Sequence, residues 1–187
     1  MKLKQLTPLL FGIILLASSC DDQEFGFNIS KEVSVDIPVV YETSEVASSV
    51  NFNPPPVTEE LRLAEFDAFA DNLNELSGVG SLVINSIAYE ITGIAGDEAT
   101  LLDALVISTT AGSEEISLVS LTGGVLANTG RTDIPLTSSQ LSALQSELLG
   151  GGNDLSIFVN IDFAAIPVEN IDVNVRVYFD ITLKIRE

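Results

Sequence analysis

Histidine and tryptophan are absent from this chain of 187 residues, and cysteine occurs only once, as Cys20. Histidine is the commonest general base and metal ligand, so its absence excludes Ser-His and Cys-His nucleophile pairs and most zinc sites. A single cysteine cannot form an internal disulfide. We therefore expect no catalytic residues and no enzymatic activity. The 27 acidic residues leave one enzymatic alternative, a glycoside hydrolase that uses two carboxylates.

Basic residues are also scarce, with eight Lys and Arg against 27 Asp and Glu and a net charge of −19. Nucleic-acid binding draws most of its affinity from basic side chains that neutralise phosphates. The charge therefore excludes nucleic acid as a partner. In contrast, 46% of the residues are hydrophobic, which is too much for an acidic disordered chain, so the protein is expected to fold.

The longest apolar run lies at the N-terminus, at residues 9–16, between Lys2 and Lys4 and the small residues at 17–19. A bilayer-spanning helix needs about 20 apolar residues, so this pattern indicates a secretory leader. Together with Cys20 it resembles the signal peptide of bacterial lipoproteins, although Ala17 and Ser19 replace the usual Leu and Ala or Gly. The resemblance implies that Cys20 receives a diacylglycerol and becomes the new N-terminus. Membrane would then be a partner through this lipid anchor.

An acidic cluster follows the cysteine, formed by Asp21, Asp22 and Glu24 around Gln23. It resembles the surface-export signal of lipoproteins in the phylum Bacteroidota. The resemblance implies a protein anchored in the outer membrane and exposed on the cell surface; the periplasmic face is the alternative location. Charge runs are commonly solvated, so a simple tether is the other interpretation of these acids.

Three regions are predicted along the chain: a signal peptide at residues 1–19, a lipidated N-terminus and acidic tether at 20–30, and a single β-sandwich domain at 31–187. About 150 residues are enough for one ordinary domain with its own core.

Strict alternation of apolar and polar residues dominates the C-terminal part. It covers residues 155–163 and 171–186, which predicts two strands with one buried and one exposed face. Pro167 lies between the two runs, and we expect an antiparallel hairpin. The register would then bring together three pairs on the exposed face: Asp162 with Asp172, Asn160 with Asn174, and Phe158 with Arg176.

Similar but shorter patterns predict strands at 33–41, 46–52, 81–92, 102–109 and 116–121, with turns at Gly93, Gly96-Asp97, 111–113 and Gly123-Gly124. The predicted fold class is mainly β, an antiparallel β-sandwich of the immunoglobulin type or similar, with two short α-helices packed on it.

The first helix is expected at 59–75 with Thr58 as its cap. The second begins after Thr137, where Gln140 completes a capping box, and is expected to end at a left-handed Gly150.

Calcium is the cation that suits these side chains, because it binds carboxylate, amide and carbonyl oxygens. The tip of the predicted hairpin would gather a candidate set, namely Asp162, Glu169, Asn170 and Asp172. A second acidic cluster lies in the first predicted helix, at Asp67, Asp71, Asn72 and Glu75. Solvated acids at turns are the simpler interpretation of both, and no other cofactor is expected.

The sequence thus favours a non-catalytic, membrane-anchored surface lipoprotein that acts as an adhesion, assembly or accessory module through protein contacts in the envelope. A carbohydrate- or calcium-binding module is the first alternative. The carboxylate-dependent glycoside hydrolase is the second.

Overall fold

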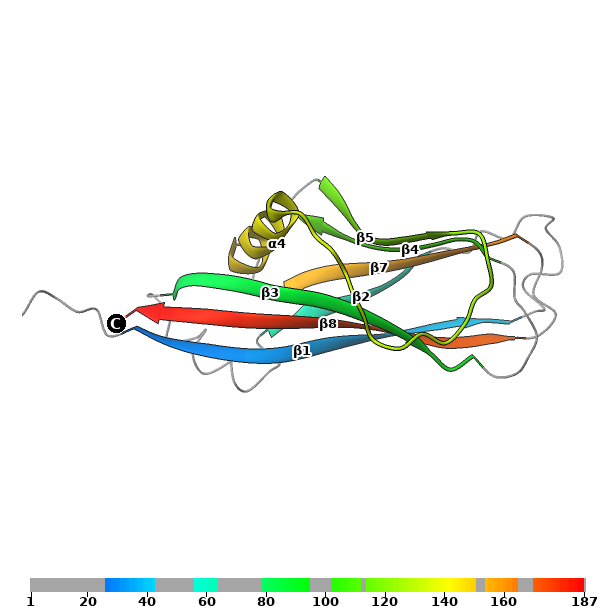
Figure 1. Cartoon of the computed structure of the whole chain (residues 1–187), viewed down its shortest axis with the longest axis horizontal. Helices are drawn as coiled ribbons and strands as arrows, with labels where there is room; N and C mark the ends of the chain where they lie inside the picture. The colour runs from blue at the N-terminus through cyan, green and yellow to red at the C-terminus, as the bar shows by residue number, and fades with distance from the viewer. Residues whose placement is uncertain are drawn as a thin grey trace, which may run out of the picture.

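A computed structural model describes residues 26–42, 56–63, 79–94, 102–111, 114–150, 154–164 and 170–186. Two antiparallel four-stranded sheets face each other and form an elongated sandwich (Figure 1). The predicted fold class is confirmed. Among the helices in these ranges, none is long and apolar enough to span a membrane.

The first sheet, sheet A, has the strand order β1-β8-β3-β6. Its strands are β1 (Gly26–Tyr41), β8 (Ile171–Arg186), β3 (Val79–Thr92) and the short β6 (Thr132–Asp133). β8 lies in the middle and pairs along its whole length with β1, from Gly26 opposite Arg186 to Tyr41 opposite Ile171. β1 therefore begins before residue 31, where the sequence placed the start of the domain.

The second sheet, sheet B, has the order β2-β7-β4-β5. Its strands are β2 (Val57–Arg62), β7 (Asp154–Phe163), β4 (Leu102–Ala111) and β5 (Glu114–Thr122). The strands predicted at 33–41, 81–92, 102–109 and 116–121 are therefore confirmed. The strand predicted at 46–52 lies outside the described residues.

The core lies between the sheets and follows the predicted alternation. On β8, every apolar residue from Ile171 to Leu183 is buried, and the intervening side chains are exposed or half-exposed. On β7, the five residues from Leu155 to Phe163 that share one face are buried in the same way. The face assignment made from the sequence is confirmed for both strands.

The predicted hairpin between these strands is wrong. β7 pairs with β2 and β4 in sheet B, whereas β8 pairs with β1 and β3 in sheet A, so the chain crosses the sandwich between them. Alternation of apolar and polar residues shows only that one face of a strand is buried. The same pattern arises whether the next strand along the chain pairs beside it in the same sheet or lies across the core in the other sheet. The three expected contacts are consequently wrong as well, because Asp162, Asn160 and Phe158 belong to the opposite sheet from Asp172, Asn174 and Arg176.

The beginning of the first predicted helix is also wrong. Residues 57–62 form β2, and Thr58 pairs with Phe158 of β7 and does not cap a helix. Residues 64–75 of that prediction lie outside the described part. Pairing with a long buried neighbour outweighs the weak local preference of the Thr-Glu-Glu run for a helix start.

The second predicted helix is confirmed as α4 (Ser138–Gly150). The Thr137 hydroxyl accepts a hydrogen bond from the Gln140 amide at 3.3 Å, and Gln140 Oε1 accepts one from the Thr137 amide at 2.9 Å. This is the expected capping box. Leu144 and Leu148 are fully buried, and the helix packs across β3, β4 and β7. Gly150 is its last helical residue and does not have the predicted left-handed conformation.

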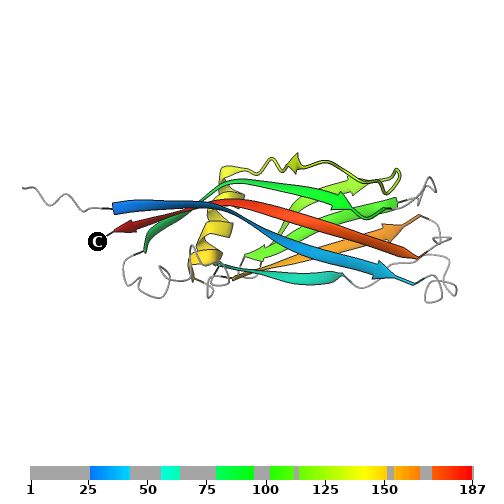
Figure 2. The same ribbon diagram turned by 90° about the horizontal axis from the view of Figure 1, so that it is seen from below.

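Between β5 and α4, residues 125–137 run along the outer edge of β3 (Figure 2). The chain turns just before this segment, at Gly123 and Gly124, whose φ angles of 68° and 105° lie in the left-handed region. Its amides at Thr129 and Ile134 donate to carbonyls of β3, both within 2.9 Å. We call residues 125–137 the edge segment, because it supplies the hydrogen-bond partners that the outer edge of β3 would otherwise lack.

The two ends of the sandwich differ. Gly26 and Arg186 lie at one end, whereas Tyr41, Gly93, Gly123 and Ile171 lie at the other (Figures 1 and 2). We call the first the N-terminal end and the second the distal end. A strand of 16 residues such as β1 is roughly 50 Å long at about 3.3 Å per residue.

Candidate functional site

The predicted lipidation and export residues, Cys20, Asp21, Asp22 and Glu24, lie outside the described part of the chain. Their roles stay predictions. The structure describes the chain again from Gly26, where β1 begins.

The calcium candidate depended on a hairpin that does not form. Asp162 lies on β7 in sheet B and Asp172 on β8 in sheet A, Asn170 directly precedes β8, and Glu169 is outside the described residues. Within the described ranges, no group of three or more acidic, cysteine or histidine residues is placed to hold a metal ion. The second acidic cluster, at residues 67–75, also lies outside them.

The outer face of sheet A carries the densest group of paired polar side chains in the described structure. We call it the β8 polar cluster; its members are Glu32, Asp36, Glu90, Arg131, Asn174, Arg176 and Tyr178. Strand register creates it, because Arg176 of β8 lies opposite Asp36 of β1 on one side and opposite Glu90 of β3 on the other. The cluster therefore spans three neighbouring strands.

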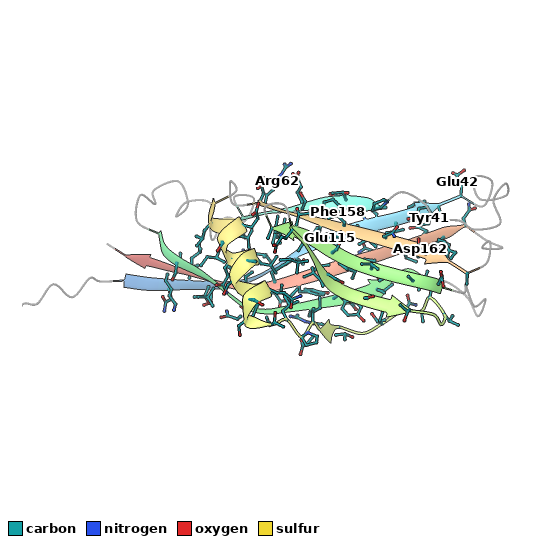
Figure 3. The ribbon with its side chains drawn as sticks, turned by 90° about the horizontal axis from the view of Figure 1, so that it is seen from above. Tyr41, Glu42, Arg62, Glu115, Phe158 and Asp162 are labelled. Atoms are coloured by element: carbon teal, nitrogen blue, oxygen red, sulfur yellow. The ribbon has the colours of Figure 1, made fainter. Side chains whose placement is uncertain are left out.

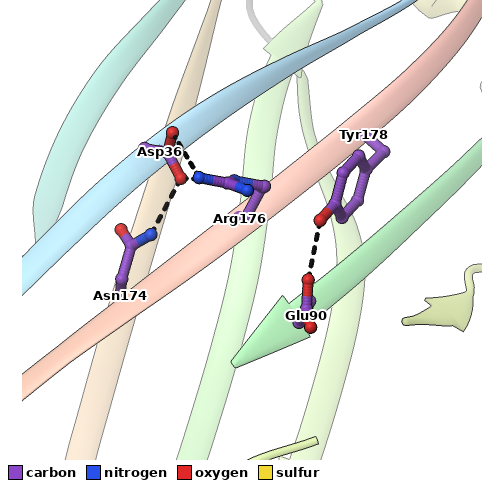
Figure 4. Close-up of polar contacts among 5 residues, drawn as sticks. All are labelled: Asp36, Glu90, Asn174, Arg176 and Tyr178. Atoms are coloured by element: carbon purple, nitrogen blue, oxygen red, sulfur yellow. Dashed lines mark hydrogen bonds and ion pairs between the residues drawn. The ribbon is translucent and has the colours of Figure 1, made fainter. Parts of the chain in front are cut away.

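One half of the cluster is built around a carboxylate (Figure 4). Arg176 donates two hydrogen bonds to Asp36, from Nε to Oδ1 at 2.5 Å and from Nη2 to Oδ2 at 3.0 Å. Asn174 donates a third bond, from Nδ2 to Asp36 Oδ1 at 2.8 Å. The hydrogen bonds from Arg176 are the main reason that the pKa of the Asp36 carboxyl lies below its ordinary value.

The other half is built around an aromatic ring. The Tyr178 hydroxyl donates to Glu90 Oε2 at 2.7 Å. The Arg131 guanidinium lies over the ring, 4.5 Å from its centroid, and forms a bidentate ion pair with Glu32. The hydrogen bond to Glu90 is the largest of the effects that raise the pKa of Tyr178, and the bonds from Arg131 lower the pKa of Glu32.

These contacts determine what the cluster can do. Tyr178 stays protonated at neutral pH, so it is a hydrogen-bond donor and not a base or nucleophile. Both arginines are neutralised by carboxylates, which leaves no excess positive charge to attract an anion. The cluster connects β1, β8, β3 and the edge segment across an exposed face, which is a structural role.

The outer face of sheet B carries an aromatic residue, Phe158 (Figure 3). Phe158 of β7 lies between Thr58 of β2 and Ser108 of β4. Phe158 and Tyr178 are partly exposed aromatic residues of β7 and β8. They lie on opposite outer faces of the sandwich, so they do not form one platform for a sugar ring.

The sequence placed Asn174, Arg176 and Tyr178 on the exposed face of their strand but did not predict the partners of these side chains. Arg131 and Glu32 are 99 residues apart, and Arg176 and Asp36 are 140 residues apart. The only available signal was the alternation of apolar and polar residues along each strand. This alternation predicts which face of the sheet a side chain occupies, but it does not predict which strand lies beside it.

Comparisons with known proteins found little. No family model matches the chain, and no curated protein matches it. Among solved structures, one of Desmodium yellow mottle tymovirus has a TM-score of 0.39 at 11% identity and covers 86% of this chain and 84% of its own. One of mud crab tombus-like virus has a TM-score of 0.34 at 9% identity and covers 94% and 98%.

The Asp36–Arg176 pair gives a pH-dependent prediction. Because the folded-state pKa of Asp36 is depressed, the pair stabilises the fold above the ordinary carboxyl pKa of 3.8 and loses this effect as pH falls through the lower folded value. Both side chains are largely exposed, so solvent screens the pair and we expect a small coupling between them at neutral pH. A double-mutant cycle with Asp36→Asn and Arg176→Gln, measured by urea unfolding at pH 7 and at about pH 2, tests this.

The matched control is a cycle between Asp36 and Lys184, which lies opposite Asn28 near the other end of β8, outside the β8 polar cluster, and should show no coupling. A coupling for Asp36–Arg176 that persists unchanged at the acidic pH would contradict the assignment to this ion pair.

Proposed function

We propose that the protein is a non-catalytic lipoprotein of the bacterial envelope that is displayed at the cell surface and acts through protein contacts. Its support is the sequence of residues 1–24, which resembles a lipoprotein signal peptide followed by a cysteine and an acidic export signal. Adhesion, assembly and accessory roles all belong to this class.

The position of β1 supports the same proposal. Only residues 21–25 separate Cys20 from the first strand residue, Gly26. A chain spans at most about 3.6 Å per residue, so the N-terminal end of the sandwich would stay within roughly 20 Å of the acylated cysteine. The distal end would then be the part directed away from the membrane.

The described surface supports a binding role at that end. The exposed large hydrophobic residues are Val40, Leu121, Val125 and Leu149. Val40 is next to the last residue of β1, and Leu121 and Val125 flank the glycine turn after β5, so three of the four lie at the distal end. Leu121 and Val125 lie close together on either side of this turn, whereas Val40 lies on β1 at the opposite edge of the sandwich. Neighbouring exposed apolar side chains such as Leu121 and Val125 are common in protein-interaction sites.

Surface display is tested by changing the proposed export signal. Replacing both Asp21 and Asp22 with alanine should reduce cleavage of the protein by protease added to intact cells, because the signal for export would be lost. The amount digested is measured against lysed cells, in which all copies are accessible.

The control is the pair Asp103→Ala and Asp133→Ala, which removes the same charge from exposed positions of the folded domain. This variant should be digested like the original protein. If the Asp21/Asp22 variant is still digested as readily on intact cells, the export proposal is wrong.

A further inference from the structure

In the described part of the structure, β5 has no neighbouring strand on one side and forms an edge of sheet B. It is the last strand in the order β2-β7-β4-β5, and β4 is its neighbour in the sheet. Within the described ranges, no backbone hydrogen bond outside the strand ladders reaches residues 114–122. An unpaired strand edge presents amide and carbonyl groups that can pair with another extended chain.

The register identifies which backbone groups point outward near the distal end. The Gly123 amide donates to the Asp103 carbonyl at 2.8 Å, so the backbone amide of Gly123 points toward β4. Hydrogen-bonding direction alternates along an antiparallel strand. Thr122, opposite Ala104, and Ser120, two residues before it, therefore direct their amides and carbonyls away from β4.

The other described strand edges are short, covered or charged, and β6, the last strand of sheet A, has only two residues. The edge segment covers β3, and β1 carries Lys31, Glu32, Asp36 and Pro38, which oppose the addition of another strand. β2 carries Glu59, Glu60 and Arg62. β5 differs, because residues 116–122 contain no charged residue and no proline over seven consecutive positions.

The two ends of β5 indicate what would bind there. Glu114 and Glu115 at its start are exposed and form no ion pair among the described residues. At its other end Leu121 is 36% exposed and Val125, just beyond the turn, 48% exposed. A complementary segment would carry basic residues at one end and apolar residues at the other.

We propose that the free edge of β5 binds an extended, basic segment of another protein, which adds to sheet B as an antiparallel strand. Backbone hydrogen bonds at Ser120 and Thr122 hold it, its basic end pairs with Glu114 and Glu115, and its apolar end covers Leu121 and Val125. This inference rests on the proposed function, because it names the surface through which the protein would make its contacts.

Charge complementarity decides between this partner and a second copy of the chain. β5 has no basic residue, so a second copy added antiparallel would leave Glu114 and Glu115 opposite uncharged residues, and the net charge of −19 on each copy opposes their association. A basic segment from a different protein removes this repulsion.

The probe is the synthetic peptide Thr-Val-Thr-Val-Thr-Val-Lys-Lys, because antiparallel addition places its C-terminal lysines opposite Glu114 and Glu115. Binding to the full chain in detergent is followed by fluorescence anisotropy, and hydrogen exchange is measured at the Ser120 and Thr122 amides. We expect saturable binding that slows exchange at both amides. A peptide N-methylated on alternate residues along the edge that faces β5 should not bind.

Two variants locate the site. Ser120→Pro removes an outward amide and should weaken binding by about tenfold or more, whereas Ser120→Ala keeps the amide and should bind like the original. Glu114→Gln with Glu115→Gln should weaken binding and reduce its salt dependence. Thermal unfolding checks that Ser120→Pro is folded, and the N-methylated peptide provides the same test without altering the protein.

Three results would overturn the inference: no binding of the unmodified peptide, equal binding of the N-methylated peptide, or self-association of the purified chain that Ser120→Pro abolishes, which would make a second copy the occupant. None of them depends on lipidation. Loss of peptide binding with normal membrane attachment and surface exposure therefore rejects the β5 site and leaves the proposed anchoring intact.

Discussion

Replacing Val175 with aspartate is expected to unfold the domain. Val175 is fully buried in β8, the strand in the middle of sheet A. Its neighbours in the sheet are Ile37 of β1 and Ile91 of β3, both of them buried. Among the described residues, the buried side chains include no basic group that could pair with a new carboxylate.

The expected cost is several kcal/mol, because an unpaired charge or a protonated acid without a hydrogen-bond partner would enter an apolar core. Domains of this size are stable by about 5–15 kcal/mol, so the substitution removes much or all of the free energy of unfolding. Urea unfolding followed by far-ultraviolet circular dichroism measures it.

Thr92→Asp is the matched control, because it introduces the same group on β3 at an exposed position next to buried Ile91. Its expected effect is within about 0.5 kcal/mol. An equally small effect for Val175→Asp would mean that the inner and outer faces of β8 have been assigned the wrong way round.

The second large effect is expected from Cys20→Ala, which should move the protein from the membrane fraction to the soluble fraction. Each buried methylene of an acyl chain contributes about 0.8 kcal/mol to membrane binding, so the two or three chains implied by the lipoprotein resemblance give stable attachment. Without the thiol no chain can be attached. Fractionation of cells labelled with an alkyne analogue of palmitate measures both attachment and acylation.

Ser19→Ala is the control for this experiment, because it keeps the cysteine and brings the preceding position closer to the usual lipoprotein pattern. This variant should stay acylated and membrane-bound. Membrane attachment of the Cys20→Ala protein in the absence of any acyl label would show that the anchor has been assigned to the wrong residue.

The inner and outer faces of the strands could be predicted from the sequence, because the two-residue period of a strand is a local property. Val175 and Ile157 were both placed in the core on this basis, and both are fully buried. The capping box of Thr137 and Gln140 was predictable for the same reason, since its partners are three residues apart.

Strand pairing was not predictable in this way. Asp162 and Asp172 are close in sequence, yet they belong to different sheets, whereas Asp36 and Arg176 form an ion pair across 140 residues. Thr58 illustrates the same difficulty on a smaller scale. The acids after it are favourable for a helix start, and only the presence of β7 beside it determines that it forms a strand.

The pairing of β1 with β8 has a mechanical consequence. The two strands are joined by a continuous register of sixteen residue pairs, and β1 is the first strand of the described structure. A pulling force between Gly26 and the distal end acts parallel to the strands, so it shears many hydrogen bonds together and does not peel them apart one after another. Such an arrangement of hydrogen bonds resists extension along the strands.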